Sequence, residues 1–301
     1  MPFQYKVPED KKVRVIIDTD AACEADDPFA IAHALMCQKF DVRAIFAEQF
    51  NREGSTRQSY EEILTVLRAM KKEVPVFMGE ETKISEKKQG EEVSPAADFL
   101  IEEAMREDEK PLFVLCIGAI TNVASAMMKE KEIAKHMTIV WIGGQGHAYS
   151  TPEVREFNAG NDVEAINYVL NSGVTFWQIP NDVYGKMRIS LAEIERRIAP
   201  CGKIGRHLFE NMETYNHSEH AGWTAGESWT LGDSPAVGVV LDPDCGFYHE
   251  TEAPIILDDT TNKFEKGRPK IRVYTSVDSR FILEDFIAKL EVLYGKDSDT
   301  K

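Results

Sequence analysis

The sequence is poor in cysteine and lacks an apolar leader. Its five cysteines show no C-x-x-C spacing, and an odd number scattered along a long chain argues against a disulfide framework. The first twelve residues, MPFQYKVPEDKK, are polar and charged, whereas a secretory signal has an apolar core. We therefore expect a cytoplasmic protein without structural disulfides.

Basic residues and long apolar runs are also scarce. The chain has 35 Lys and Arg against 51 Asp and Glu, a formal charge of -16. Binding to a phosphate backbone needs a basic face, so we expect no nucleic-acid partner. The uncharged run Pro111–Met128 contains Pro, Gly, Thr, Asn and Ser. It is interpreted as a buried strand, a turn and a helix start, and no membrane association is expected.

What the sequence does contain is a regular alternation of strand-like and helix-like segments. This alternation predicts an open, mostly parallel α/β sheet flanked by helices, with a Rossmann-like core. Strands are expected at Val13–Asp18, Val42–Ala47, Val74–Met78, Leu112–Ile117, Thr138–Ile142, Val174–Ile179 and Ile271–Thr275. Helices are expected at Asp26–Cys37, Ser55–Met70, Ser94–Met105, Thr121–Met128, Asp162–Asn171, Leu191–Ile198, Ile204–Tyr215, Pro235–Leu241 and Arg280–Leu293.

The loosest part of the pattern is Asn216–Asp233, which is rich in Gly, His and Trp and is expected to be a loop. No linker or internal repeat divides the chain. We expect one domain over residues 1–301, with a core of about 13–293 and a disordered tail at about 296–301.

The segment DTDAACEADD, residues 18–27, carries the strongest chemical signal. Five carboxylates fall within ten residues, directly after the first predicted strand. Ligands of open α/β sheets bind outside the carboxyl ends of strands. Crowded carboxylates repel one another unless a cation neutralises them, and calcium prefers oxygen ligands. A helix cap at Asp26 with surface acids around it is the simpler alternative, and it is weakened by the two acids that close a buried strand.

The order strand, DTD, short loop, DD and apolar helix resembles the nucleoside hydrolases, whose signature is D-x-D-P-G-x-D-D. Here the Pro-Gly pair is absent, and five residues instead of three separate Asp20 from Asp26. The chain is therefore expected to represent a divergent branch. Three further segments resemble the family in the same order, namely GAITNVASAM (118–127), EFN (156–158) and GDSPAV (232–237).

The resemblance implies calcium-dependent hydrolysis of the N-glycosidic bond of a ribonucleoside or related N-riboside, in purine or pyrimidine salvage. Asp20, Asp27, Asp233 and the carbonyl of Ile117 would hold Ca²⁺, with Asp20 also acting as the catalytic base. Asp26, Glu156 and Asn158 would bind ribose, and Asn51 matches a family asparagine. Asp18 would support the loop. A homodimer or homotetramer is also implied.

The main departure from the family pattern is Gly232, which stands where the family has a histidine. The group that assists the leaving base is therefore open, with His147, His217 and His220 as candidate acids and Trp223 or Trp229 as candidate stacking residues. A member of the family that binds ribose without turnover is the alternative. A phosphohydrolase is disfavoured because no Lys, Arg or Gly-rich phosphate cradle follows the first strand.

Overall fold

The computed structural model describes residues 3–87 and 90–295, so the expected tail at 296–301 lies outside the described residues. An eight-stranded sheet runs through the molecule in the order β3-β2-β1-β4-β5-β6-β12-β9. All pairings are parallel except that between β12 and β9. The predicted fold class is confirmed. The strands are β1 (Val13–Thr19), β2 (Phe40–Ala47), β3 (Val76–Met78), β4 (Leu112–Cys116), β5 (Met137–Ile142), β6 (Thr175–Ile179), β9 (Gly246–Glu252) and β12 (Lys270–Val277).

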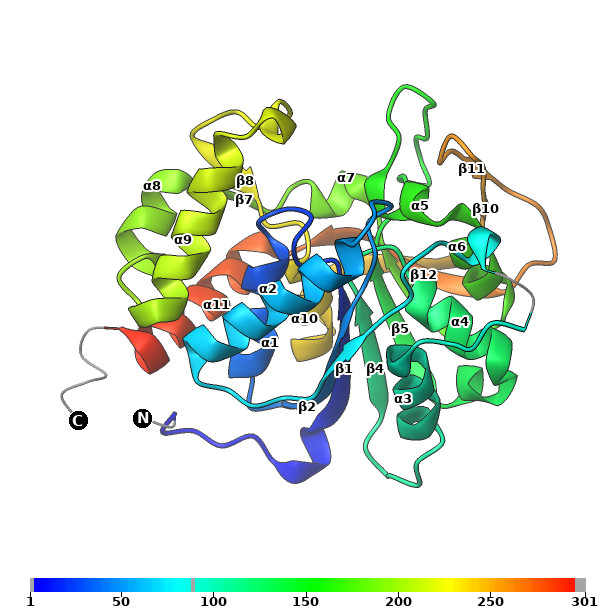
Figure 1. The fold of residues 1–301 in the computed structure, drawn as a ribbon, viewed down its shortest axis with the longest axis horizontal. Coiled ribbons are helices and arrows are strands. Elements are labelled where there is room, and N and C mark those ends of the chain that lie inside the picture. The colour runs from blue at the N-terminus through cyan, green and yellow to red at the C-terminus, as the bar shows by residue number, and fades with distance from the viewer. Residues whose placement is uncertain (1–2, 88–89, 296–301) are drawn as a thin grey trace.

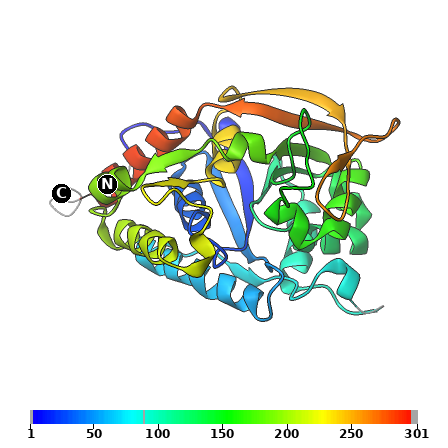
Figure 2. The same cartoon turned by 90° about the horizontal axis from the view of Figure 1, so that it is seen from above.

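Helices cover both faces of this sheet, as Figures 1 and 2 show. Two separate clusters of buried apolar side chains lie between the helices and the two faces. One face carries α1 (Asp27–Met36), α2 (Ser55–Met70), α9 (Gly202–Asn216), α10 (Ser234–Leu241) and α11 (Ser279–Tyr294). The other carries α3 (Pro95–Ala104), α4 (Thr121–Lys129) and α6 (Val163–Asn171). The central parallel strands β1, β4 and β5 are buried on both sides, which explains why their sequences are mostly apolar.

Several short elements were not predicted. The expected loop Asn216–Asp233 contains a short 3-10 helix, η5 (Glu219–Ala221), and β8 (Ser228–Thr230), which pairs with β7 (Arg188–Ser190). The expectation of a loop is wrong for η5 and β8. A three-residue strand is too short to show the alternation of apolar and polar residues that predicts a strand. The other additions are α5 (Phe157–Asn161), α7 (Asn181–Tyr184), β10 (Ile255–Ile256) and β11 (Asn262–Lys263), besides the edge strand β9.

The predicted helix Leu191–Ile198 is divided in the structure. It begins as α8 (Leu191–Glu193) and continues as a five-residue π-helix, η4 (Ile194–Ile198). Short 3-10 helices occur at η1 (Glu9–Lys11), η2 (Ile84–Glu86) and η3 (Lys131–Lys135). Within the described ranges, no helix is long and apolar enough to cross a bilayer.

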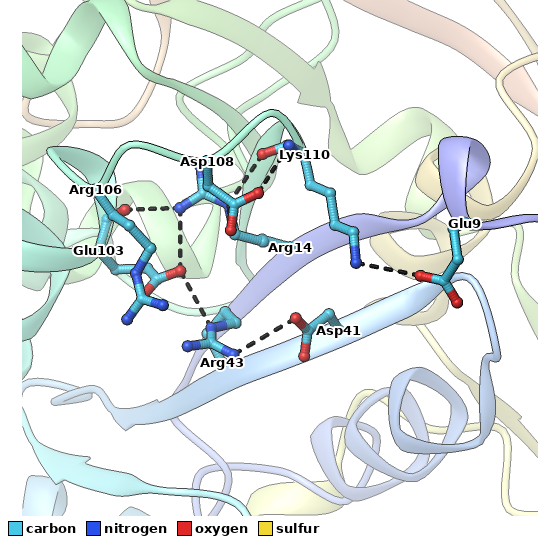
Figure 3. A network of polar contacts seen from close by, with 8 residues as sticks. All are labelled: Glu9, Arg14, Asp41, Arg43, Glu103, Arg106, Asp108 and Lys110. Atoms are coloured by element: carbon cyan, nitrogen blue, oxygen red, sulfur yellow. Dashed lines mark hydrogen bonds and ion pairs between the residues drawn. The ribbon is translucent and has the colours of Figure 1, made fainter.

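A buried ion-pair network holds the amino ends of the first strands. Arg14, only 3% exposed, donates from Nη1 to the carbonyl oxygen of Glu103 at 2.8 Å and to its Oε1 at 3.0 Å. Arg43 on β2 donates to the same Oε1 at 3.1 Å. Figure 3 shows these residues together with Asp41, Asp108 and Lys110. The network joins β1, β2 and the end of α3 at the amino ends of the strands, opposite the acidic loop at their carboxyl ends.

Candidate functional site

The strand order changes direction between β1 and β4, and the predicted site lies there. The chain moves outward from β1 to β3 and then returns to place β4 on the other side of β1. Such a switch point leaves a crevice at the carboxyl ends of the two strands. A pocket opens at this position, and its lining is formed by Asp20, Cys23, Glu24, Asp26, Asp27, Ile117, Ile142, Glu156, Phe157, Asn158, Tyr184, Gly232 and Asp233.

Three aspartates converge in the pocket although one of them comes from the far end of the chain. Asp26, Asp27 and Asp233 each offer a carboxylate oxygen, and these oxygens lie within 4.8 Å of one another. The backbone nitrogen of Gly232 donates to Asp26 Oδ2 at 3.0 Å, and Thr19 Oγ1 donates to Asp27 Oδ1. The set is all oxygen, which is the donor type that hard divalent cations prefer.

Burial and mutual repulsion raise the pKa values of these acids, so they ionise less readily when no cation is bound. Burial raises the pKa of Asp27 to about 8, with a further contribution from the Asp26 charge. The pKa of Asp26 is raised to about 6 by burial. Burial, followed by neighbouring carboxylates, also holds the pKa of Asp20 and Asp233 well above the usual range. A bound cation would remove this penalty, because it favours the charged form of every ligand.

Asp20 packs against the backbone that follows β4. A Cβ atom placed on Gly118 would lie 2.8 Å from Asp20 Oδ1 and 3.0 Å from its Cγ. Both distances are shorter than an ordinary van der Waals contact of about 3.4–4 Å. Gly118 is therefore required by the position of the Asp20 carboxylate, and this explains the glycine of the GAITN segment.

If Asp20 is the predicted catalytic base, Gly118→Ala is expected to reduce ribose release by about 100-fold, because misplacing a catalytic group by about 1 Å costs about that much. The added methyl must displace the Asp20 carboxylate while the chain folds as before. Steady-state kinetics and calcium titration calorimetry would measure the effect. Gly222→Ala is the matched control, because a Cβ there meets no atom within 4 Å. Wild-type kinetics in Gly118→Ala would contradict the assigned position of Asp20.

Buried polar side chains next to the pocket are joined by hydrogen bonds to Asn122. Asn122 on α4 donates from Nδ2 to Asp18 Oδ1 at 2.8 Å, and its backbone nitrogen donates to Glu48 Oε2 at 3.0 Å. Burial raises the pKa of Asp18 to about 7 and that of Glu48 well above its usual range. Asn122 also accepts from the nitrogen of Glu80 at 2.7 Å. These contacts give the asparagine of the GAITN segment a supporting role.

Glu156 and Asn158 lie in the pocket wall at the start of α5. Glu156 caps this helix by accepting from the backbone nitrogens of Asn158 and Ala159. Asn158 donates from Nδ2 to the carbonyl oxygens of Ile142 at 2.9 Å and Ile117 at 3.3 Å. A carbonyl oxygen has two lone pairs, so the Ile117 oxygen can accept one further contact. Asn158 is left with its side-chain oxygen for a ligand.

Four other predicted residues are not brought to the pocket lining. Asn51 is exposed in the loop after β2, with a positive φ of 56°. His147 bonds Gln178 Oε1 at 2.9 Å and packs near Phe264. Trp229 is fully buried against Tyr215 and Trp223, whereas Trp223 is 49% exposed.

The structure does not support base stacking by Trp229, because its ring is part of the core. The candidate acids His217 and His220 are also outside the lining. Their side chains are exposed and lie beside Glu213 and Glu219 respectively.

Sequence reasoning missed several lining residues. Glu24 and Cys23 belong to the acidic segment, and Glu24 was counted there without a role. Burial raises the pKa of Glu24 to about 8. Tyr184 gave no signal, because it ends a four-residue helix in the part of the chain where the pattern loosens. Its position becomes visible only when α7 is placed beside Gly232.

A wider groove lies elsewhere, between α4, α6 and the β10–β11 hairpin, with a volume of about 1490 Å³. None of the predicted site residues lines it. The smaller acidic pocket is the better candidate site, because convergent polar groups with perturbed pKa values are typical of functional sites.

The chain is similar to known proteins of one family. The family model described as inosine-uridine preferring nucleoside hydrolase matches residues 15–284. The pyrimidine-specific ribonucleoside hydrolase RihA of Salmonella arizonae is 29% identical over 235 residues, covering 70% of this chain and 74% of its own. RihA of Salmonella agona is 27% identical over 285 residues, covering 86% and 88% respectively.

Solved structures share the fold at lower identity. A purine-preferring ribonucleoside hydrolase from Gardnerella vaginalis gives a TM-score of 0.78 at 22% identity, covering 93% of this chain and 99% of its own. The plant nucleoside hydrolase PpNRh1 gives 0.75 at 20% identity, covering 92% and 98%. Since the family model spans nearly the whole described chain, the chain belongs to the inosine-uridine preferring nucleoside hydrolases, a family of N-glycosyl hydrolases.

Proposed function

We propose that this chain hydrolyses the N-glycosidic bond of a ribonucleoside in a calcium-dependent reaction. The observation that carries the proposal is the convergence of Asp20, Asp26, Asp27 and Asp233 in one pocket, with Asn158 and the Ile117 carbonyl beside them. Membership of the family indicates the reaction class, and the set of oxygen donors in the pocket favours calcium as the ion.

The residues present fit a calcium ion. The acid oxygens within 4.8 Å of one another belong to Asp26, Asp27 and Asp233, and Asp20 and the Ile117 carbonyl line the same pocket. Calcium takes 6–8 oxygen ligands, so the protein would supply most of the shell and leave places for water and sugar hydroxyls. We infer Asp20, Asp27, Asp233 and Ile117 as ligands, and the position of Asp26 makes it an additional candidate ligand. When bound, calcium would orient a water molecule and lower its pKa.

Cleavage of an N-glycosidic bond passes through an oxocarbenium-like transition state, which needs a nucleophilic water and a stabilised sugar cation. Asp20 would take a proton from the attacking water, since calcium is a weak acid and a carboxylate must complete the deprotonation. The surrounding negative charge of Asp26 and Glu156 would favour the cationic sugar. Asn158 would accept a hydrogen bond from a sugar hydroxyl through its side-chain oxygen.

The test is ribose release from a panel of purine and pyrimidine ribonucleosides with calcium present. We expect turnover of at least one member, with the corresponding deoxyribonucleoside cleaved more slowly because a hydroxyl contact is lost. RihA of Salmonella arizonae is described as pyrimidine-specific, so uridine and cytidine belong in the panel. No release from any riboside would overturn the proposed reaction.

A ligand-binding member without turnover is the second candidate. Gly232 favours it, because glycine cannot donate a proton to a leaving base. Calorimetry with D-ribose and with each nucleoside separates the two functions: binding without ribose release identifies the second. A homodimer or homotetramer stays a prediction for light scattering. The edge strand β9 exposes Phe247 and Tyr248, a surface that a second copy would cover.

A further inference from the structure

The space beside Gly232 is filled by an aromatic ring from another segment. A Cβ atom on Gly232 would lie 3.2 Å from Tyr184 Cδ2 and 3.3 Å from Asp26 Oδ2. Both contacts are tighter than most Cβ contacts in proteins, so a larger side chain at position 232 would compete with Tyr184 for this space. The residue that replaces the histidine at this part of the pocket is therefore a tyrosine that comes from α7.

The hydroxyl of Tyr184 completes the hydrogen bonding of Glu156. It donates to Glu156 Oε1 at 2.8 Å, and the nitrogen of Asn158 donates to the same oxygen at 3.3 Å. The nitrogens of Gly144 and Ala159 donate to Oε2, each at 2.8 Å. A carboxylate offers about four acceptor positions, and all four are filled. A sugar hydroxyl therefore cannot reach Glu156 unless it displaces Tyr184.

The tyrosine is held in place by the same loop that holds Glu156. At the start of α7, the nitrogen of Asn181 donates to the carbonyl oxygen of Gly144 at 3.0 Å. The side-chain oxygen of Asn181 accepts from the nitrogen of Gly146 at 3.2 Å. Gly144 in turn donates to Glu156. Tyr184 and its acceptor are thus fixed to one short segment, which defines the direction of the phenol.

We propose that Tyr184 is a substrate-positioning residue, an inference that rests on the proposed function. Its proton is committed to Glu156, so its phenolic oxygen is the acceptor that a sugar hydroxyl meets in the pocket. A tyrosine hydroxyl has one donor and two acceptor positions, which permits both contacts at once. Its ring forms the wall that a side chain at position 232 would otherwise supply. Glu156 acts through Tyr184 instead of binding the sugar directly.

Tyr184→Phe removes the hydroxyl and keeps the ring. We expect KM for the best riboside to rise roughly 10- to 100-fold, the effect of losing one hydrogen bond within a charged network. The kcat should change by less than about 3-fold, since a contact made equally in the ground and transition states affects KM alone. Competitive inhibition by D-ribose should weaken in parallel. The melting temperature should stay close to that of the wild type.

Tyr168→Phe is the matched control. Tyr168 is half-buried and donates to the carbonyl oxygen of Met127 at 3.2 Å, away from the acidic pocket. Its removal should leave KM and ribose inhibition unchanged. If Tyr184→Phe also leaves both unchanged, the proposal is wrong. A loss of kcat without a change in KM would contradict it as well, because the hydroxyl would then act in the chemical step.

A pair of variants tests the shared space. Gly232→His should lose activity because the new side chain meets the ring of Tyr184. The double variant Tyr184→Ala/Gly232→His should be more active than the combined losses of the two single variants predict, because substitutions of residues in contact are not additive. Additive effects would overturn the claim that the two positions share one space. This comparison does not depend on the hydroxyl, so it stands even where Tyr184→Phe alters folding.

The outcome also separates this inference from the proposed function. If the wild type releases ribose and Tyr184→Phe behaves like it, only the role of Tyr184 fails. If the wild type neither releases nor binds ribose, the proposed function fails, and the role of Tyr184 fails with it.

Discussion

Asp20→Asn is expected to abolish ribose release while leaving the fold intact. Loss of a general base costs about 10²- to 10⁴-fold in rate, and weaker calcium binding should deepen the loss. The substitution keeps the shape of the side chain, so the close packing against Gly118 is retained. Single-turnover and steady-state assays at saturating calcium would measure the reduction. Wild-type rates would remove Asp20 from the mechanism.

Stability measurements distinguish a catalytic loss from damage to the fold. Without calcium, Asp20→Asn should melt at the same temperature as the wild type or higher, because it removes one acid from a buried, mutually repelling group. Asp98→Asn is the matched control, since Asp98 is exposed on α3 and pairs with Lys129 at 2.6 Å. It should retain full activity. A large drop in the melting temperature of Asp20→Asn alone would indicate structural damage.

Calcium is expected to stabilise the protein strongly at pH 8. A ligand at 100 times its Kd adds about 2.7 kcal/mol to the free energy of unfolding. Thermal unfolding in calcium and in a chelator would measure this as a shift of several degrees. Asp233→Asn should remove most of the response. Equal melting temperatures in calcium and chelator at pH 8 would contradict calcium binding at this site.

The benefit should shrink as the pH falls, and the direction follows from the raised pKa values. In the metal-free fold the pKa is about 6 for Asp26 and about 8 for Asp27, against about 3.9 in an unfolded chain. The folded state therefore binds more protons than the unfolded state. The contribution of Asp26 and Asp27 to the free energy of unfolding of the metal-free protein is fully present below about pH 4. It is lost as the pH rises toward 8. Calcium reverses this loss, so its effect should be greatest at the highest pH.

The parallel sheet was predictable because its strands are apolar on both faces. Six of the predicted parallel strands overlap β1 to β6, and Ser55–Met70 matches α2 at both ends. The carboxylates of Asp20, Asp26 and Asp27 were predictable because they follow one such strand at a place where ligands bind. Asp233 required the family resemblance, since nothing local in Gly232–Pro235 indicates a partner at the other end of the chain.

Features that depend on tertiary contacts could not be predicted. Tyr184 reaches the pocket only because α7 folds back toward Gly232. Trp229 was one of two candidate stacking residues because its segment resembles a loop, whereas pairing of β8 with β7 places its ring in the core. Arg14 lies within an apolar run, and its ion pair with Glu103 depends on the end of α3. In each case the decisive partner is distant in sequence.

The acidic residues of the pocket come from distant parts of the chain, so they are synthesised at different times. Asp26 and Gly232 meet although they lie 206 positions apart in the sequence, so the acidic loop leaves the ribosome long before Asp233 is synthesised. The strand β12 that follows Asp233 also joins the sheet late, beside β6. A nascent chain that ends before α10 (Ser234–Leu241) and Asp233 holds the crowded carboxylates of residues 18–27 but lacks Asp233. If calcium binds as proposed, its capture is completed only after Asp233 has been synthesised, and a chain cut short before Asp233 lacks one of the proposed ligands.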